Sequence, residues 1–114
     1  MKSTSPDAAW QHELIELISF ASQDKPTLKK LLEELLSPEE LRATALRWQI
    51  IKLLKRNIPH RNIAQSLQTS IVTVTRGSRI LSKPQNGFHK LFRMIQHTKQ
   101  PTGLLKAWRK QLTE

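Results

Sequence analysis

The sequence predicts an all-α protein, organised as one domain over residues 1–114 with about six helices. Apolar side chains recur at intervals of three and four along most of the chain, which is the spacing of a buried helix face. Residues that favour helix starts stand where these patterns begin. A β-branched run at residues 71–75 has no second strand nearby with which it could pair, so we expect it to be helical.

Two helices are expected in the first 36 residues. Asp7 precedes an amphipathic pattern, which predicts a helix at about residues 8–22. Asp24-Lys25-Pro26 then restarts the chain, because proline suits the first turn of a helix. A broad leucine stripe follows and predicts a second helix that ends near Leu36.

The clearest local signal in the sequence is Ser37-Pro38-Glu39-Glu40. It combines an N-cap serine, a proline at the first helical position and a glutamate at the third, which together make a capping box. We expect a long third helix from this box to about Arg56, with Asn57 as a left-handed terminator. The residues expected to be buried on this helix are Leu41, Ala45, Trp48, Ile51 and Leu54.

Residues 60–79 have the apolar spacing and central break of a helix-turn-helix, so we assign this motif to about residues 60–80. The polar segment Gln68-Thr69-Ser70 forms the connection, and Ser70 is expected to cap the second helix. The alternative is a helical hairpin on the surface that binds no ligand. The residues expected to pack the two helices together are Ile63, Ala64, Leu67, Ile71 and Val74.

The end of the chain is predicted to hold one more helix and a short turn. Lys83 to Gly87 is a turn-rich linker. From Phe88 onward, apolar residues recur at helical intervals, which predicts a sixth helix. Leu104 to Lys110 is expected to form a last short basic turn. We expect residues 98–114 to be a basic C-terminal extension.

Charge is distributed very unevenly along the sequence. All but one of the nine acidic residues lie in the first 40 positions, whereas all but five of the 19 Lys and Arg residues lie at Arg47 or beyond it. A stretch this basic favours a polyanionic partner, and counterion release from duplex DNA would supply affinity that falls with salt. We expect phosphate and base-edge contacts from His60, Arg61, Ser70, Ile71, Val72, Thr73, Thr75 and Arg79.

Composition narrows the other possibilities. The absence of cysteine excludes a disulfide framework and thiol chemistry. The four histidines lack metal-ligand spacing, so we expect neither a metal site nor an enzyme. The N-terminus lacks the apolar run of a signal peptide and no stretch approaches membrane-spanning length, so a cytoplasmic DNA reader is expected. A chain this short leaves much of its surface exposed, which favours dimerisation.

Several segments together resemble the Trp repressor family, over about residues 10 to 97. They are Leu36-Ser37-Pro38-Glu39-Glu40, Arg47 followed by Ile50-Ile51, Ile63-Ala64 with Leu67, and Ile71-Val72-Thr73-Val74-Thr75-Arg76-Gly77-Ser78. The resemblance implies a six-helix, intertwined homodimer that binds L-tryptophan as a corepressor. With tryptophan bound, such a protein binds the operator of tryptophan biosynthetic genes and blocks transcription initiation.

The resemblance also implies a tryptophan site made by Leu36, Ser37, Arg47, Arg76 and Gly77. The two arginines could stack on the two faces of an indole, and Arg76 could also pair with the carboxylate of the ligand. Gly77, without a Cβ, would leave room for the ligand to touch the backbone. Ile80 departs from the family, whose typical members have serine there.

Two other classes of function remain open at this stage. One is a ligand-independent helix-turn-helix module, of the transposase type or architectural. The other is a membrane-surface or partner-binding protein that uses the basic amphipathic segment from Phe88 to Trp108.

Overall fold

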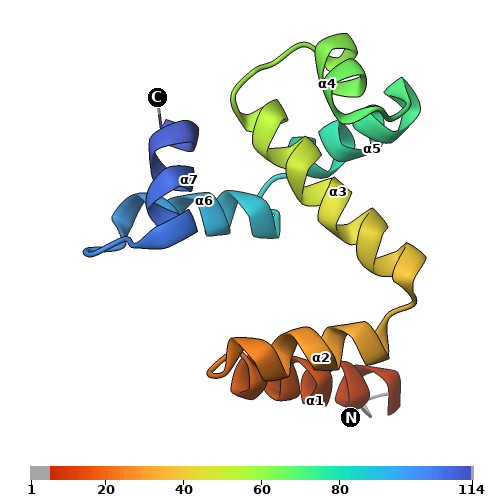
Figure 1. The fold of residues 1–114 in the computed structure, drawn as a ribbon, viewed down its shortest axis with the longest axis vertical. Coiled ribbons are helices and arrows are strands. Elements are labelled where there is room, and N and C mark those ends of the chain that lie inside the picture. Colours follow the sequence, from red (N-terminus) through yellow and green to blue (C-terminus); the bar gives the residue numbers. More distant parts are fainter. Residues whose placement is uncertain (1–5, 114) are drawn as a thin grey trace, which may run out of the picture. The chain divides into compact units, whose positions relative to one another are not determined.

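The computed structural model describes residues 6–113, and all regular secondary structure in this range is helical (Figure 1). Inter-residue contacts divide the chain into two units, with the division after Ala43. The helices are α1 (Pro6–Ala21), α2 (Lys25–Leu35), α3 (Pro38–Lys55), α4 (His60–Leu67), α5 (Ile71–Ser82), α6 (Gly87–His97) and α7 (Gly103–Thr113).

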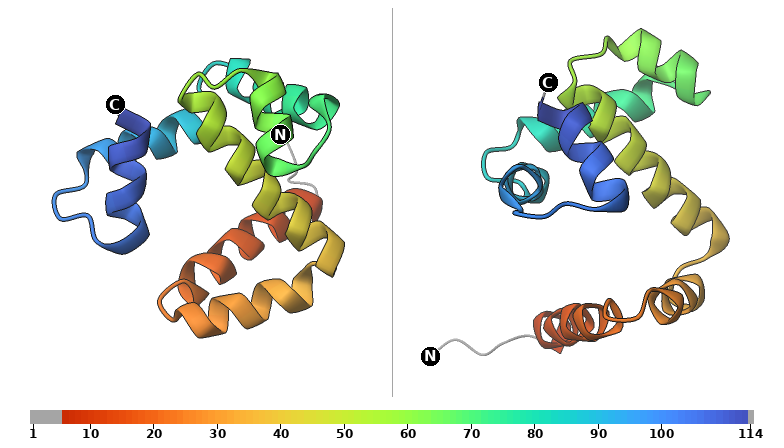
Figure 2. Two further views of the ribbon diagram at one scale, coloured as in Figure 1. Left: turned by 45° about the horizontal axis from the view of Figure 1, so that its top comes forward. Right: turned by 60° about the vertical axis from the view of Figure 1, so that its left-hand side comes forward.

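In the first unit, α1 and α2 lie side by side as a helical hairpin (Figures 1 and 2). Asp24 caps α2, because its carboxylate accepts a hydrogen bond from the Thr27 amide at 3.2 Å and another from the Thr27 hydroxyl. Ala21 is buried at the end of α1. Both predicted helices are confirmed, with ends that differ from the prediction by only one or two residues.

The predicted capping box opens α3. The Ser37 amide donates to a Glu40 carboxylate oxygen at 2.8 Å, and the Glu40 amide donates to the Ser37 hydroxyl at 3.1 Å. Hydrogen bonds from the Ser37 backbone and side chain lower the pKa of the Glu40 carboxyl below its ordinary value. At the other end of the helix, Asn57 has a φ of 60°, which confirms the predicted left-handed terminator.

The core of the second unit is built on Ile50 and Ile51 of α3, which are 1% and 0% exposed. Adjacent residues of a helix point about 100° apart, so these two side chains enter different clusters. The Ile50 cluster also holds Ile63, Ala64 and Val74 from α4 and α5. The Ile51 cluster holds Phe92, Ile95 and Leu112 from α6 and α7. The two helix pairs consequently lie on different sides of α3 (Figures 1 and 2).

Burial on α3 and α5 differs from the sequence prediction at several positions. Of the α3 residues expected to be buried, Ile51 is buried, whereas Leu41, Trp48 and Leu54 are half-buried and Ala45 is exposed. Ile50 is buried although it was not among the predicted core residues. Ile71 is 51% exposed, so α4 and α5 pack through Val74 without it. Ile71 is the first residue of α5, three positions before the packed Val74.

The predicted connection between α4 and α5 is confirmed at residues 68–70. Gln68 adopts left-handed backbone geometry with a φ of 54°, and its amide donates to carbonyls at the end of α4. Ser70 then caps α5 by accepting from the Thr73 amide at 3.1 Å. The β-branched run at residues 71–75 is helical as predicted, since the cap and the packing of Val74 outweigh its strand propensity.

The last short turn predicted by the sequence is a full helix, α7, so the described residues form seven helices where six were expected. The Arg109 side chain donates to the carbonyls of Ile95, Gln96 and Thr98 at the end of α6. The Trp108 ring packs edge-on against Trp48 of α3, with 5.4 Å between ring centroids. These contacts attach α7 to both α6 and α3.

Gly77 lies where α5 passes close to α3. A Cβ placed on Gly77 would lie 2.9 Å from Cγ2 of Ile50 and 3.4 Å from Cδ1 of Leu54. The first distance is shorter than side-chain carbons tolerate, and Ile50 is itself fully packed. The missing side chain of Gly77 therefore sets how closely α5 approaches α3.

We predict that Gly77→Ala destabilises the protein. Overpacking against Ile50 should cost about 1–3 kcal/mol, while the higher helix propensity of alanine should return about 1 kcal/mol, leaving a net loss of about 1 kcal/mol. Urea unfolding of the full chain measures the difference. Gly87→Ala is the matched control, because no atom lies within 4 Å of a Cβ there. A Gly77→Ala protein more stable than the wild type would contradict the close approach.

Candidate nucleic-acid interface

The second unit carries no carboxylate side chain between Thr44 and Thr113, while it carries most of the Lys and Arg residues of the chain. Its cations therefore have no opposite charge within those residues to neutralise them. The unit as a whole has a strongly positive potential, which attracts polyanions and raises their rate of association.

The predicted DNA-contacting residues all lie on the α4–α5 pair and its connection. The predicted residues all fall between positions 60 and 79 of the chain, and Ser70 is the N-cap of α5. Exposed members of the set are Arg61, Ser70, Ile71, Val72 and Arg79, and the half-buried members are His60, Thr73 and Thr75.

The N-terminus of α5 exposes two large apolar side chains. Ile71 is 51% exposed and Val72 is 63% exposed, at the helix end where backbone amides are free to donate. Apolar side chains at such a position suit contact with thymine methyl groups, and free amides suit contact with phosphate oxygens. The hydroxyls of Ser70 and Thr73 are hydrogen-bonded to each other at 2.9 Å. This bond orders the same helix end.

His60 lines a surface pocket of about 440 Å³ that no local pattern in the sequence predicts. The pocket joins the end of α3 to the start of α4 and the second half of α5. Its polar lining residues are Asn57, His60, Ser78 and Ser82. Residues this far apart in the sequence give no local signal that they share a surface.

The residues implied for a tryptophan site divide between the two units. Arg47 on α3 and Arg76 on α5 are exposed and belong to the second unit, where Gly77 is buried against α3. Leu36 and Ser37 are half-buried and belong to the first unit, between α2 and α3. The Ser37 hydroxyl is already engaged as the acceptor of the capping box.

Among residues 6–113, no three His, Asp or Glu side chains are grouped so that they could hold a metal ion. None of the helices described has the length and apolar character needed to cross a membrane.

Comparison with known proteins relates the chain to a family of transcription regulators. The sequence model described as "Trp repressor protein" matches residues 8–96, which is most of the chain. The protein belongs to the Trp repressor family. Helix α7 lies beyond the range of this match, although it is packed into the core of the second unit.

Three relatives, each named "Trp operon repressor homolog", illustrate the extent of the similarity. The protein of Actinobacillus succinogenes is 48% identical over 54 residues, covering 46% of this chain and 54% of its own length. That of Mannheimia succiniciproducens is 44% identical over 70 residues, covering 60% of this chain and 68% of its own. That of Vibrio campbellii is 36% identical over 93 residues, covering 80% of this chain and 91% of its own. No solved structure is significantly similar to the chain.

Proposed function

We propose that this member of the Trp repressor family is a tryptophan-dependent transcriptional repressor. With L-tryptophan bound, it binds the operator of tryptophan biosynthetic genes and blocks transcription initiation. The observation that carries the proposal is the family match over residues 8–96, which includes both the α4–α5 pair and the two exposed arginines. The lack of carboxylate side chains between Thr44 and Thr113, together with the many Lys and Arg residues there, supports a nucleic-acid partner independently of the match.

In this proposal the α4–α5 pair is a helix-turn-helix and α5 is its recognition helix. The exposed end of α5 enters the major groove, where Ile71, Val72, Thr73 and Thr75 lie nearest the base edges. Phosphate contacts from Arg61, Ser70 and Arg79 hold the helix in position, with His60 at the start of α4. Few of these side chains can read a base with two hydrogen bonds, so direct readout is limited and backbone contacts supply much of the affinity.

Tryptophan acts in this proposal through the separation of α3 and α5. In the second unit, the guanidinium planes of Arg47 and Arg76 are proposed to lie on the two faces of the indole, beside Gly77. A bound ligand then favours one tilt of α5. A tenfold gain in DNA affinity requires tryptophan to prefer the DNA-competent tilt by about 1.4 kcal/mol, which two cation–π contacts can supply.

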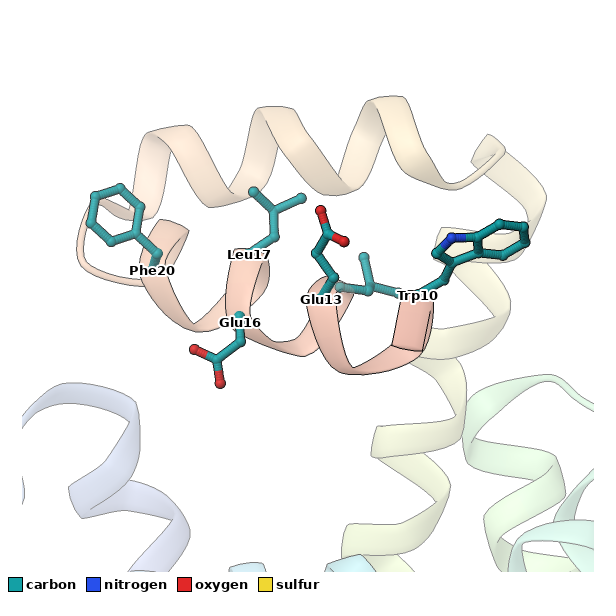
Figure 3. A pocket seen from close by; sticks show the side chains of 6 residues that line it. Trp10, Glu13, Glu16, Leu17 and Phe20 are labelled. Carbon is teal, nitrogen blue, oxygen red and sulfur yellow. The ribbon is translucent and has the colours of Figure 1, made fainter. Parts of the chain in front are cut away.

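We further propose that the repressor acts as a homodimer, because the first unit leaves an apolar face uncovered. Trp10, Leu17 and Phe20 share one face of α1 and are 66%, 46% and 73% exposed. A groove of about 750 Å³ runs along the same helix, and Figure 3 shows Trp10, Glu13, Leu17 and Phe20 spaced along it. Apolar surface of this extent on a small protein is typical of a protein interface. A second copy of the chain is the proposed occupant.

The alternative of a membrane-surface segment from Phe88 to Trp108 is not favoured by the packing. Phe92 and Ile95 are buried, and Phe88 and Trp108 pack against Trp48 of α3. The apolar side of this segment is thus used inside the second unit. A helix that binds a membrane surface needs that side free.

Arg61→Ala is expected to weaken binding to all duplexes and to reduce the slope of log affinity against log salt by about one unit, because one phosphate contact is lost. Fluorescence anisotropy at several salt concentrations measures the slope. Lys30→Ala is the matched control, since Lys30 is an exposed cation of the acidic first unit. An unchanged slope in Arg61→Ala would remove this residue from the interface.

Arg76→Ala is expected to abolish the dependence of operator binding on tryptophan, because the ligand loses one stacking plane and its carboxylate partner. Gel shifts against promoter fragments of tryptophan biosynthetic genes, with and without tryptophan, measure the effect. Arg79→Ala serves as the control: it should lower affinity in both conditions and leave their ratio intact. If the wild type binds the operator with the same affinity with and without tryptophan, the protein is a ligand-independent DNA-binding module.

Phe20→Asp is expected to raise the dissociation constant of the dimer about tenfold or more, because a charge replaces a large apolar contact at the interface. Sedimentation equilibrium of the full chain gives the constant. Gln11→Asp adds the same charge to an exposed polar position of α1 and should leave dimerisation unchanged. Equal effects of the two substitutions would show that α1 does not form the interface.

A further inference from the structure

A cationic pocket lies between the last turn of α3 and one face of α6. It has a volume of about 340 Å³ and draws its residues from three segments: α3, the turn before α6, and α6 itself. None of its residues belongs to the DNA-contacting or tryptophan sets described above. The residues that line this pocket, called the α6 pocket, are Lys55, Gln85, His89, Phe92, Arg93 and Gln96.

The lining of the α6 pocket suits an anion. Lys55 is half-buried, and its Nζ lies 5.6 Å from the centroid of the Phe92 ring. Arg93 adds a second positive charge one residue further along α6. No carboxylate side chain occurs between Thr44 and Thr113, so neither cation is neutralised within that stretch. Unneutralised cations in a concave site concentrate anions there.

The backbone that carries the α6 pocket is held from both ends of α6. The Asn86 side chain caps the helix by accepting from the His89 amide at 3.0 Å. The His89 Nε2–H donates to the Leu81 carbonyl at 2.9 Å. At the far end, Arg109 donates to the carbonyls of Ile95 and Gln96. A fixed backbone lowers the entropy lost when the lining side chains order around a ligand.

We propose that the α6 pocket binds a phosphate group. Lys55 supplies a compact charge, Arg93 supplies a planar fork that matches two phosphate oxygens, and the Gln85 and Gln96 amides supply neutral donors. Donors on several sides suit the tetrahedral oxygens of phosphate. The phosphate belongs either to a DNA backbone or to a small phosphorylated molecule, and the site is independent of the proposed repressor function.

The direct test is a titration of the full-length, isotope-labelled protein with inorganic phosphate, followed by NMR shifts of the amides at residues 92–96. The wild type should show saturable shifts there. Lys55→Gln/Arg93→Gln should bind at least about tenfold more weakly, since it loses two charge-assisted contacts. The matched control is Lys106→Gln/Lys110→Gln, which removes the same charge from exposed positions of α7 and should titrate like the wild type.

Three results would overturn the proposal: no saturable shift at residues 92–96, a pocket variant that titrates like the wild type, or an equal loss in the α7 control. The last would mean that general charge attraction explains the binding. Thermal unfolding checks that the pocket variant is folded. Arg93→Gln alone is the second variant, because Arg93 is exposed and its replacement leaves the core intact.

A mixed-sequence duplex distinguishes the two sources of phosphate. If DNA shifts the same amides and the pocket variant lowers the salt slope by about two units, the ligand is the DNA backbone. If phosphate and a nucleoside monophosphate shift these amides while the DNA salt slope is unchanged, the ligand is a small phosphorylated molecule. A wild type that bound no duplex would overturn the proposed repressor function, and the phosphate titration would still decide the α6 pocket.

Discussion

The burial of two adjacent isoleucines on α3 organises the second unit. Ile50 and Ile51 are both almost completely buried, yet they point to different sides of the helix and belong to different clusters. Each cluster recruits one helix pair, α4 with α5 or α6 with α7. A single helix therefore fixes the positions of the α4–α5 pair and of the α6–α7 pair at once. A change in either cluster is transmitted through this shared, close-packed helix.

The α3–α5 contact links this core to the candidate ligand site. Gly77 allows α5 to approach Ile50 of α3. Arg76 is the residue next to Gly77 on α5, and Arg47 lies on α3 one turn before Ile50. In the proposed mechanism, the close approach that stabilises the core also sets the spacing that an indole would have to match. No carboxylate side chain occurs between Thr44 and Thr113 to neutralise these arginines. An anion that binds beside them is therefore attracted electrostatically.

Local signals in the sequence determined α1 to α6, several of their caps and the charge of each part of the chain. The Ser37–Glu40 box, the Ser70 cap and the left-handed Asn57 depend on residues within a few positions of each other, so they can be read without the fold. Each segment that carries the family resemblance is also short and can be read in the same way. The sequence likewise placed the candidate DNA residues on one helix pair.

Only the tertiary structure decided which apolar residues are covered and which distant side chains share a surface. Ile71 and Ile50 follow similar helical spacing, but one is half exposed and the other buried, because burial depends on where a neighbouring helix lies. Helix α7 is stabilised by Trp48 and α6, more than ten residues away in the sequence. The α6 pocket likewise joins Lys55 to Arg93. Contacts between residues so far apart leave no periodic signal in the chain, and only packing brings them together.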